Sequence, residues 1–294
     1  MEQFSKIFEK FVVEKSFLYL VSTPIGNLGD LSLRSIKTLQ EVDYILCEDS
    51  RVTNKILSKL EIKNKNLISY NDFNSKSKRP VIINNLINKK CNYALVSDAG
   101  TPLISDPGFK LVKECLENNI KITHIPGPTS VISGLILSGL PTNEFFFGGF
   151  FEKSLNKRKK QLEKYQTIET TSIWFESSNR VITTLNLLLE IFGNRNISIC
   201  RELTKLNEEI MHGTIKKNLS YLRKKNKLLG EIVLIISGYK KTQLDKKELK
   251  DLILKNLDKR TTKDLSSELA DKTGLGKKFI YNEILKIKSK KLEG

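Results

Sequence analysis

The sequence contains little histidine and little cysteine. Its 294 residues include 2 His and 4 Cys. His124 and His212 are isolated from each other, and no Cys-x-x-Cys pair occurs. This argues against a zinc site and against a histidine-dependent catalytic triad. Widely spaced cysteines are typical of reduced thiols, so we expect a cytoplasmic protein with no bound metal.

Long apolar runs are also absent. No stretch approaches the roughly 18 apolar residues of a membrane-spanning helix. Near the start, Phe11-Val-Val is interrupted by Glu14 and Lys15, so we expect neither a signal peptide nor a membrane partner. The sequence has no Gly-Lys-Ser/Thr and no Gly-x-Ser-x-Gly, which excludes a P-loop nucleotidase and the nucleophile elbow of many hydrolases.

Proline is missing from the second half, because all 7 prolines lie at or before Pro141. The stretch Pro141–Gly149 is typical of a linker that runs into a strand, and we place a domain boundary there. We expect an N-terminal extension (1–16), an α/β domain (17–141), a second, basic α/β domain (142–239) and a C-terminal helical unit (240–294).

In the first half, the expected elements alternate between strands and helices, which is typical of βαβ units and a mostly parallel sheet. In the first domain we expect strands at Phe17–Ser22, Asp43–Cys47, Leu67–Tyr70, Tyr93–Ser97 and Lys121–Ile125. The helices between them are expected near Leu31–Gln40, Ser50–Leu60, Arg79–Lys89 and Phe109–Asn118. The second domain is expected to continue with Leu155–Tyr165 (helix), Thr171–Phe175 (strand), Arg180–Ile191 (helix), Ile197–Glu202 (strand), Ile215–Lys225 (helix) and Glu231–Ser237 (strand).

The C-terminal unit is expected to hold two short amphipathic helices, Asp264–Ala270 and Phe279–Leu285, across a glycine turn at 274–276. This pattern fits a small helix-turn-helix unit, and it fits equally a helical hairpin that only packs on the body.

The charge is strongly positive and uneven. Residues 1–150 carry 18 Lys and Arg against 15 Asp and Glu, whereas residues 151–294 carry 32 against 18. Such an excess favours a polyanionic partner, with nucleic acid first. The alternative is a lysine-rich surface that reflects only the composition of the genome.

The most unusual segment is Ser97–Gly108, which follows an apolar strand and contains two Asp, two Pro and two Gly. We interpret Asp106 as a helix N-cap and Pro107 as the first helical position. A simple strand-to-helix turn needs fewer special residues than Ser97–Thr101 contains. Ligands bind at the carboxyl ends of strands in open α/β sheets, so we expect this segment to belong to a ligand site.

Three more strand ends of the first domain carry special loops: Ser22–Asp30, Cys47–Arg51 and Pro126–Ser130. Glu48 and Asp49 could act as a general base or a metal-ligand pair, or Asp49 or Ser50 could be a helix cap beside Arg51. Four such loops indicate one shared binding site.

Two strand ends of the second domain, Phe175–Arg180 and Cys200–Lys205, combine carboxylates with cations. Such pairs could hold phosphate and sugar or handle a hydroxyl proton. They could instead be salt bridges between the domains.

In order, the motifs are Thr23-Pro-Ile-Gly-Asn-Leu-Gly-Asp30, Glu48-Asp-Ser-Arg51, Ser97–Gly108, Pro126-Gly-Pro-Thr-Ser130, Phe175-Glu-Ser-Ser-Asn-Arg180 and Arg201-Glu-Leu-Thr-Lys205. From about Phe17 to Tyr239 the chain strongly resembles the ribosomal RNA small subunit methyltransferase I family, within the tetrapyrrole methylase-like class. The resemblance is weaker for the C-terminal helices. The chain departs from the family pattern at Gly29, where many relatives have another residue, and at Phe150-Phe-Glu, which lacks the proline expected soon after Gly149.

The resemblance implies two α/β domains with S-adenosylmethionine bound in the cleft between them. It implies methylation of the ribose 2′-hydroxyl of a decoding-centre cytidine in 16S rRNA, free or within the small ribosomal subunit, by a homodimer. The cofactor-binding residues that it implies are Ser97, Asp98, Ala99, Gly100, Thr101, Pro128, Thr129 and Ser130.

A ribose hydroxyl is a poor nucleophile, so a group that accepts its proton should help. Glu202, Lys205, Glu48 and Asp49 are the candidates, and Lys205 would have to be neutral to act as a base. Candidate RNA contacts are Lys157, Arg158, Lys159, Lys160, Arg180 and Arg201, together with Lys216, Lys217 and 223–225. The alternatives are a tetrapyrrole methyltransferase and a non-catalytic RNA-binding or assembly protein.

Overall fold

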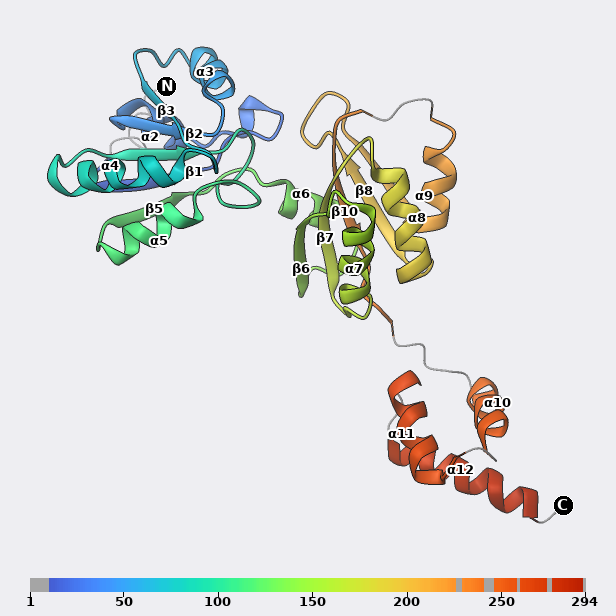
Figure 1. Ribbon diagram of the computed structural model, residues 1–294. Coiled ribbons are helices and arrows are strands. Elements are labelled where there is room, and N and C mark those ends of the chain that lie inside the picture. Colours follow the sequence, from blue (N-terminus) through green and yellow to red (C-terminus); the bar gives the residue numbers. More distant parts are fainter. Residues whose placement is uncertain (1–10, 226–228, 241–245, 258–259, 274–276, 293–294) are drawn as a thin grey trace. The chain divides into compact units, whose positions relative to one another are not determined.

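The computed structural model describes residues 11–225, 229–240, 246–257, 260–273 and 277–292. They form two compact units, divided between Gly238 and Tyr239. The first unit contains two five-stranded sheets and the second is helical (Figure 1). The α/β fold class and the C-terminal helical unit are therefore confirmed. Across the described residues, no helix is long and apolar enough to span a membrane.

The first sheet is entirely parallel, with strand order β3-β2-β4-β1-β5. Its strands are β1 (Phe17–Val21), β2 (Tyr44–Cys47), β3 (Asn66–Ser69), β4 (Tyr93–Val96) and β5 (Lys121–Ile125). The helices that follow them are η1 (Leu28–Asp30), α2 (Leu33–Glu41), α3 (Ser50–Lys59), α4 (Ser75–Asn88), α5 (Phe109–Glu117) and α6 (Ser130–Leu137). The five expected strands and the parallel sheet are confirmed, with small shifts at the ends.

Helices cover both faces of this sheet. Side chains of α4 and α5 pack with the strands on one face, where Leu86, Leu95 and Leu111 are buried. Side chains of α2 and α3 pack on the other face with Leu39 and Leu57. Strands covered on both faces have continuous apolar sequences, and all four residues of β4 are accordingly buried.

The second sheet is mostly antiparallel, with order β6-β7-β10-β8-β9. Its strands are β6 (Phe145–Phe150), β7 (Thr171–Ser177), β8 (Asn196–Arg201), β9 (Glu209–Thr214) and β10 (Glu231–Ile236). Its helices are α7 (Leu155–Tyr165), α8 (Val181–Phe192) and α9 (Ile215–Leu222). The sequence does not predict strand β9, because Glu209–Thr214 lacks an apolar alternation. In the structure it is an edge strand in which only Met211 is fully buried.

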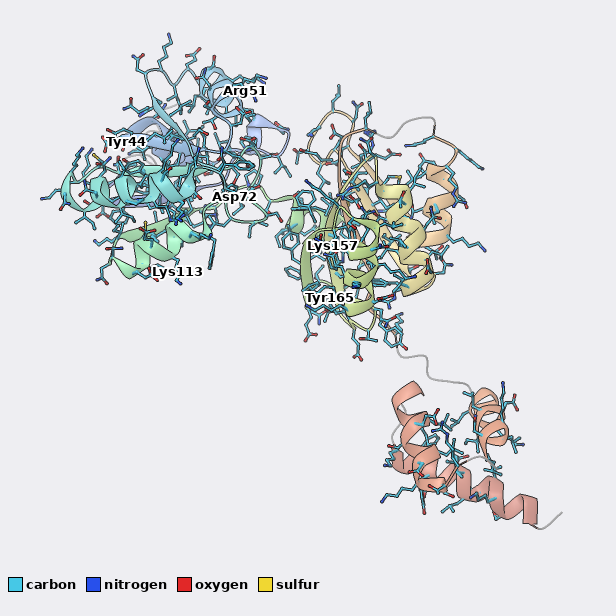
Figure 2. All side chains as sticks on the ribbon, in the orientation of Figure 1. Tyr44, Arg51, Asp72, Lys113, Lys157 and Tyr165 are labelled. Carbon is cyan, nitrogen blue, oxygen red and sulfur yellow. The ribbon has the colours of Figure 1, made fainter. Side chains whose placement is uncertain are left out.

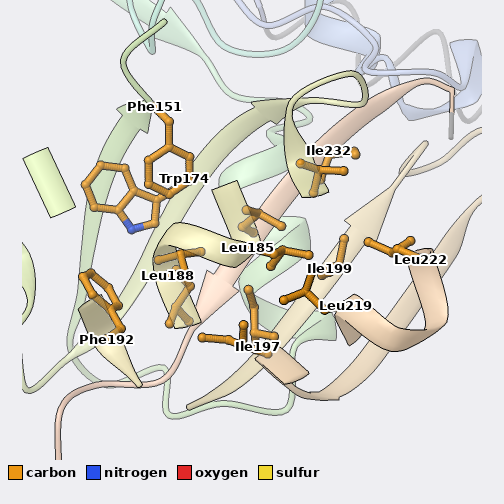
Figure 3. Packing of buried hydrophobic residues seen from close by; sticks show 14 of the residues in the cluster. Phe151, Trp174, Leu185, Leu188, Phe192, Ile197, Ile199, Leu219, Leu222 and Ile232 are labelled. Carbon is orange, nitrogen blue, oxygen red and sulfur yellow. The ribbon is translucent and has the colours of Figure 1, made fainter. Parts of the chain in front are cut away.

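One face of the second sheet packs on α7, α8 and α9 around Trp174, which stacks on Phe151 (Figure 3). The other face packs on α6, where Val131 and Leu135 contact a cluster with Val233 and Ile235. Helix α6 begins directly after the loop that follows β5. It therefore joins the loops of the first sheet to the second sheet.

The start of α5 differs from the prediction. The helix begins at Phe109 and its N-cap is Gly108, with no side-chain cap. Gly108 has φ +134°, and a β-carbon there would lie 2.6 Å from Leu95. The chain therefore turns at Gly108, and Asp106 accepts a hydrogen bond from Ser97. The prediction that Asp106 and Pro107 start the helix is wrong.

The C-terminal unit contains α10 (Lys246–Asn256), α11 (Thr262–Thr273) and α12 (Lys277–Leu292). Leu249 and Ile253 of α10 pack with Leu265, Leu269, Ile280 and Ile284. Helix α10 is not among the elements predicted from the sequence, and the other two helices are longer than predicted. The predicted glycine turn at 274–276 lies outside the described residues.

Candidate active site

The loops after β1, β4 and β5 are joined by hydrogen bonds. Thr23 and Gly100 exchange backbone hydrogen bonds of 2.9 and 3.0 Å. The Oγ1 of Thr101 lies 3.0 Å from Oγ of Ser22 and donates to the carbonyl of Pro128 at 3.2 Å. Because the strands are parallel, these carboxyl-end loops meet at one edge of the sheet.

A cavity of about 370 Å³ lies against these loops, which we call the first cavity. Six predicted cofactor residues line it: Asp98, Ala99, Gly100, Thr101, Thr129 and Ser130. Ser97 and Pro128 do not line it. Ser97 is buried and forms a hydrogen bond with Asp106. The carbonyl of Pro128 accepts the hydrogen bond that the Thr101 side chain donates.

The second sheet supplies the opposite wall of the first cavity, which includes Phe150, Phe175, Cys200, Val233 and Glu231. Two of these residues, Phe175 and Cys200, begin loops that the sequence predicts as candidate site loops, but none of the five is among the predicted cofactor residues. Ile104, Ser105 and Asp106, in the loop after β4, also line the cavity without having been predicted as cofactor residues. An apolar residue at the end of a strand gives no signal of its own in one sequence, because it reads as core.

The first cavity fits S-adenosylmethionine in size and in chemistry. A few hundred Å³ is typical of small-ligand sites. The carboxyl groups of Asp98, Asp106 and Glu231 suit a ligand with cationic groups, and the aromatic and aliphatic walls suit a flat base. Burial raises the pKa of Asp98, although the backbone N–H of Asp49 donates to it at 3.0 Å. Burial likewise raises the pKa of Asp106.

Glu48 and Asp49 follow β2 and line neither of the two cavities described here. Asp49 is the N-cap of α3, and its carboxylate accepts from the backbone N–H of Arg51 at 2.8 Å. Hydrogen bonds from Arg51 lower the pKa of Asp49 to about 2. Burial raises the pKa of Glu48, reinforced by the charges of Asp106 and Asp98. The capping interpretation of Asp49 is thus confirmed.

Glu202 and Lys205 form an ion pair in the loop after β8. Lys205 Nζ lies 2.9 Å from Glu202 and 3.0 Å from Glu231. Burial lowers the pKa of Lys205, but the hydrogen bonds to Glu202 and Glu231 outweigh it, so the pKa is raised overall. Burial raises the pKa of Glu202, but hydrogen bonds from the Glu231 N–H and Lys205 reverse that shift. Both groups are therefore charged at neutral pH.

Glu176 is a fully buried carboxylate at the edge of the first cavity. It lies 2.7 Å from Arg180, accepts a 2.5 Å hydrogen bond from Thr184 and lies 3.8 Å from Arg158. Arg158 is 2 % exposed and also donates to two backbone carbonyls. A buried guanidinium held in this way cannot reach an RNA backbone, so we remove Arg158 from the proposed RNA contacts.

The other predicted RNA contacts lie on the surface or at its edge. Lys157, Lys159 and Lys160 are exposed on α7, where Figure 2 marks Lys157, and Lys159 pairs with Glu190 at 2.9 Å. Arg201 pairs with Glu209 at 3.2 Å. Lys216 and Lys217 are exposed on α9. The exposed lysines of this set therefore lie on α7, on α9 and, in the case of Lys224, just after α9, whereas Arg180 and Arg201 are held in ion pairs.

Comparisons with known proteins agree with this arrangement. The family model described as "Tetrapyrrole (Corrin/Porphyrin) Methylases" matches residues 17–218. A ribosomal RNA small subunit methyltransferase I from Rickettsia prowazekii is 43% identical over 280 residues, which is 95% of each chain. The protein of that name from Thermotoga maritima is 44% identical over 223 residues, covering 75% of this chain and 98% of its own.

Solved structures show the same fold at low identity. A cobalt precorrin-4 methyltransferase aligns with a TM-score of 0.56 at 15% identity, covering 76% of this chain and 95% of its own. A diphthine synthase aligns with a TM-score of 0.58 at 12% identity, covering 75% and 90%. The expectation of a methyltransferase is confirmed by the relatives. The chain belongs to the ribosomal RNA small subunit methyltransferase I family, whose members are S-adenosylmethionine-dependent enzymes.

Proposed function

We propose that this protein methylates the ribose 2′-hydroxyl of a decoding-centre cytidine in 16S rRNA, in the cytoplasm. The observation that carries the proposal is the first cavity. It is lined by the loop after β4, by the start of α6 and by residues of the second sheet. The names of the relatives at 43 and 44% identity support ribosomal RNA as the substrate.

Bound S-adenosylmethionine supplies a methyl group made electrophilic by a sulfonium. The protein must hold a nucleophile in line with that group and exclude water, and such positioning accounts for much of the acceleration. Phe150, Phe175 and Leu203 supply apolar walls. Asp98 is held in place by the backbone of Asp49.

We assign Lys205 an electrostatic role. Once the 2′-hydroxyl proton has passed to solvent, the Lys205 ammonium, held between Glu202 and Glu231, can stabilise the negative charge on the ribose oxygen. Among the four candidates for the proton acceptor, only Lys205 lines either of the two cavities described here. Because it is protonated, we do not propose it as the base.

We further propose a homodimer. Ile132, Ile136 and Leu137 of α6 are exposed, as are Phe145 and Phe150 of the edge strand β6. An exposed set of large apolar side chains marks an interaction surface. A second copy covers this surface in our proposal. Light scattering should give a dimer for the wild type and a monomer for Ile136→Glu.

The function is tested by nucleoside mass spectrometry of 16S rRNA from cells that lack the gene, and by methyl transfer with the purified protein. We expect loss of one 2′-O-methylcytidine in the cells and its restoration in vitro, on free 16S rRNA or on small subunits. An intact mark would refute the assignment. Methylation of a porphyrinoid in place of RNA would establish the tetrapyrrole alternative.

A further inference from the structure

A second cavity of about 260 Å³ adjoins the first. It shares four lining residues with the first cavity: Ile25, Asp98, Ala99 and Glu231. Its remaining walls come from the loop after β1, from α3 and from Lys205. A ligand in the second cavity would therefore lie next to a ligand in the first, and Lys205, which lines the second cavity, pairs with the shared residue Glu231.

The wall formed by α3 carries exposed cations. Lys55 and Lys59 both line the second cavity, and both are exposed. Four residues apart on a helix, they share one face, with Arg51 one turn earlier. Figure 2 marks Arg51 on α3. In the part of the chain that the structure describes, neither Lys55 nor Lys59 forms a salt bridge, whereas Lys205 opposite has two acidic partners.

The second cavity also has apolar walls. Pro24, Leu28, Val52 and Ile56 line the same cavity. A cavity with apolar walls and a row of cations on α3 suits a nucleotide, because the base or sugar can cover the apolar walls while phosphates meet the lysines. A neutral small molecule would make no use of the row.

Charge composition alone does not account for this row. The first 150 residues are almost balanced, with 18 cations against 15 carboxylates, and every RNA contact predicted from the sequence lies in the second half. The cations at the second cavity are concentrated by the position of α3, not by a general excess.

We propose that the second cavity binds the RNA strand beside the target nucleotide, with Lys55 and Lys59 contacting its phosphates. The inference rests on the proposed function, since it assumes that the first cavity holds the methyl donor. The strand then reaches the shared wall from the α3 side, and the target ribose meets Lys205 there.

The test replaces both lysines, Lys55→Ala with Lys59→Ala, in the full-length protein. Affinity for a 16S rRNA fragment is measured by filter binding as a function of salt. Loss of two phosphate contacts should reduce the slope of log affinity against log salt by about 1.4 and weaken binding about tenfold near physiological salt. The kcat/KM for methyl transfer should fall in parallel, while calorimetric S-adenosylmethionine binding stays unchanged.

Two variants serve as controls. Lys110→Ala with Lys113→Ala removes two exposed lysines of α5 that line neither of the two cavities described here, and should leave the slope unchanged. Lys55→Arg with Lys59→Arg keeps the charges and should restore binding.

This proposal would be overturned if the α3 and α5 double variants had the same salt slope and the same RNA affinity. If the wild type is active in that experiment, the proposed function remains intact. A wild type that binds RNA through Lys55 and Lys59 but transfers no methyl group to it would overturn the proposed function instead.

Discussion

Lys205 Nζ lies 2.9 Å from Oε1 of Glu202, and both groups belong to one short loop after β8. The same ammonium reaches Glu231, which lines both cavities. This geometry separates two roles that the sequence leaves open for Lys205. A base must be neutral, whereas an electrostatic stabiliser must be charged.

Lys205→Arg distinguishes these roles. Arginine stays protonated, so loss of a base should cost about 10²–10⁴ in kcat. If the charge acts alone, the arginine variant should keep most of the activity, and Lys205→Gln should lose about tenfold or more. Single-turnover methyl transfer measures both. A collapse of Lys205→Arg to the level of Lys205→Gln, with S-adenosylmethionine binding intact, would contradict the electrostatic role.

Asp106→Asn should raise stability at neutral pH. Burial raises the pKa of Asp106, so the folded state binds more protons than the unfolded state above the ordinary pKa of about 3.9. The contribution of Asp106 to the free energy of unfolding therefore falls as the pH rises from about 3.9 through the raised pKa. The asparagine variant should melt higher at pH 7, by about 2–4 °C per kcal/mol regained.

The gain from Asp106→Asn should vanish near pH 3, where both states are protonated. The exposed Asp72 supplies the matched control, since Asp72→Asn should leave the melting temperature unchanged at both pH values. A gain for Asp106→Asn that is equally large at acid pH would contradict the electrostatic explanation.

Arg158 and Lys157 are neighbours in sequence with opposite expected effects. Arg158→Met leaves the buried Glu176 with one cation fewer and should cost about 3 kcal/mol of stability. Lys157→Ala with Lys160→Ala should leave stability unchanged and lower the salt slope of RNA binding by about 1.4. Urea denaturation and filter binding measure the two effects. A stable Arg158→Met with a reduced salt slope would reverse our assignment.

Gly26→Ala should disturb the loop that forms the boundary of the second cavity. A β-carbon on Gly26 would lie 2.4 Å from Cγ of Lys205 and 3.0 Å from the carbonyl of Leu203. The lysine stem can move, but the backbone carbonyl can move only with its loop, and overpacking of this kind costs about 1–3 kcal/mol. Methyl transfer should fall more than stability. Full activity in Gly26→Ala would show that the loop tolerates displacement.

The sequence by itself determined the alternation of strands and helices, the parallel first sheet and the motif loops at its strand ends. These follow from local patterns, because side-chain period and turn residues are properties of short segments. The loop at 98–101 and the start of α6 could therefore be predicted as site residues. Asp49 could be predicted as a cap for the same reason.

Only the tertiary structure decided what stands opposite those loops. Phe150, Phe175 and Glu231 line the first cavity because the second sheet packs on α6, and no local pattern encodes that contact. In sequence, Arg158 belongs to a basic run, yet its position on α7 buries it beside Glu176. Lys55 and Lys59 belong to the nearly balanced half of the chain, yet α3 places both at a cavity. Burial and ion pairing depend on segments far apart in the chain, so composition can predict a basic protein but not which of its cations are free to bind.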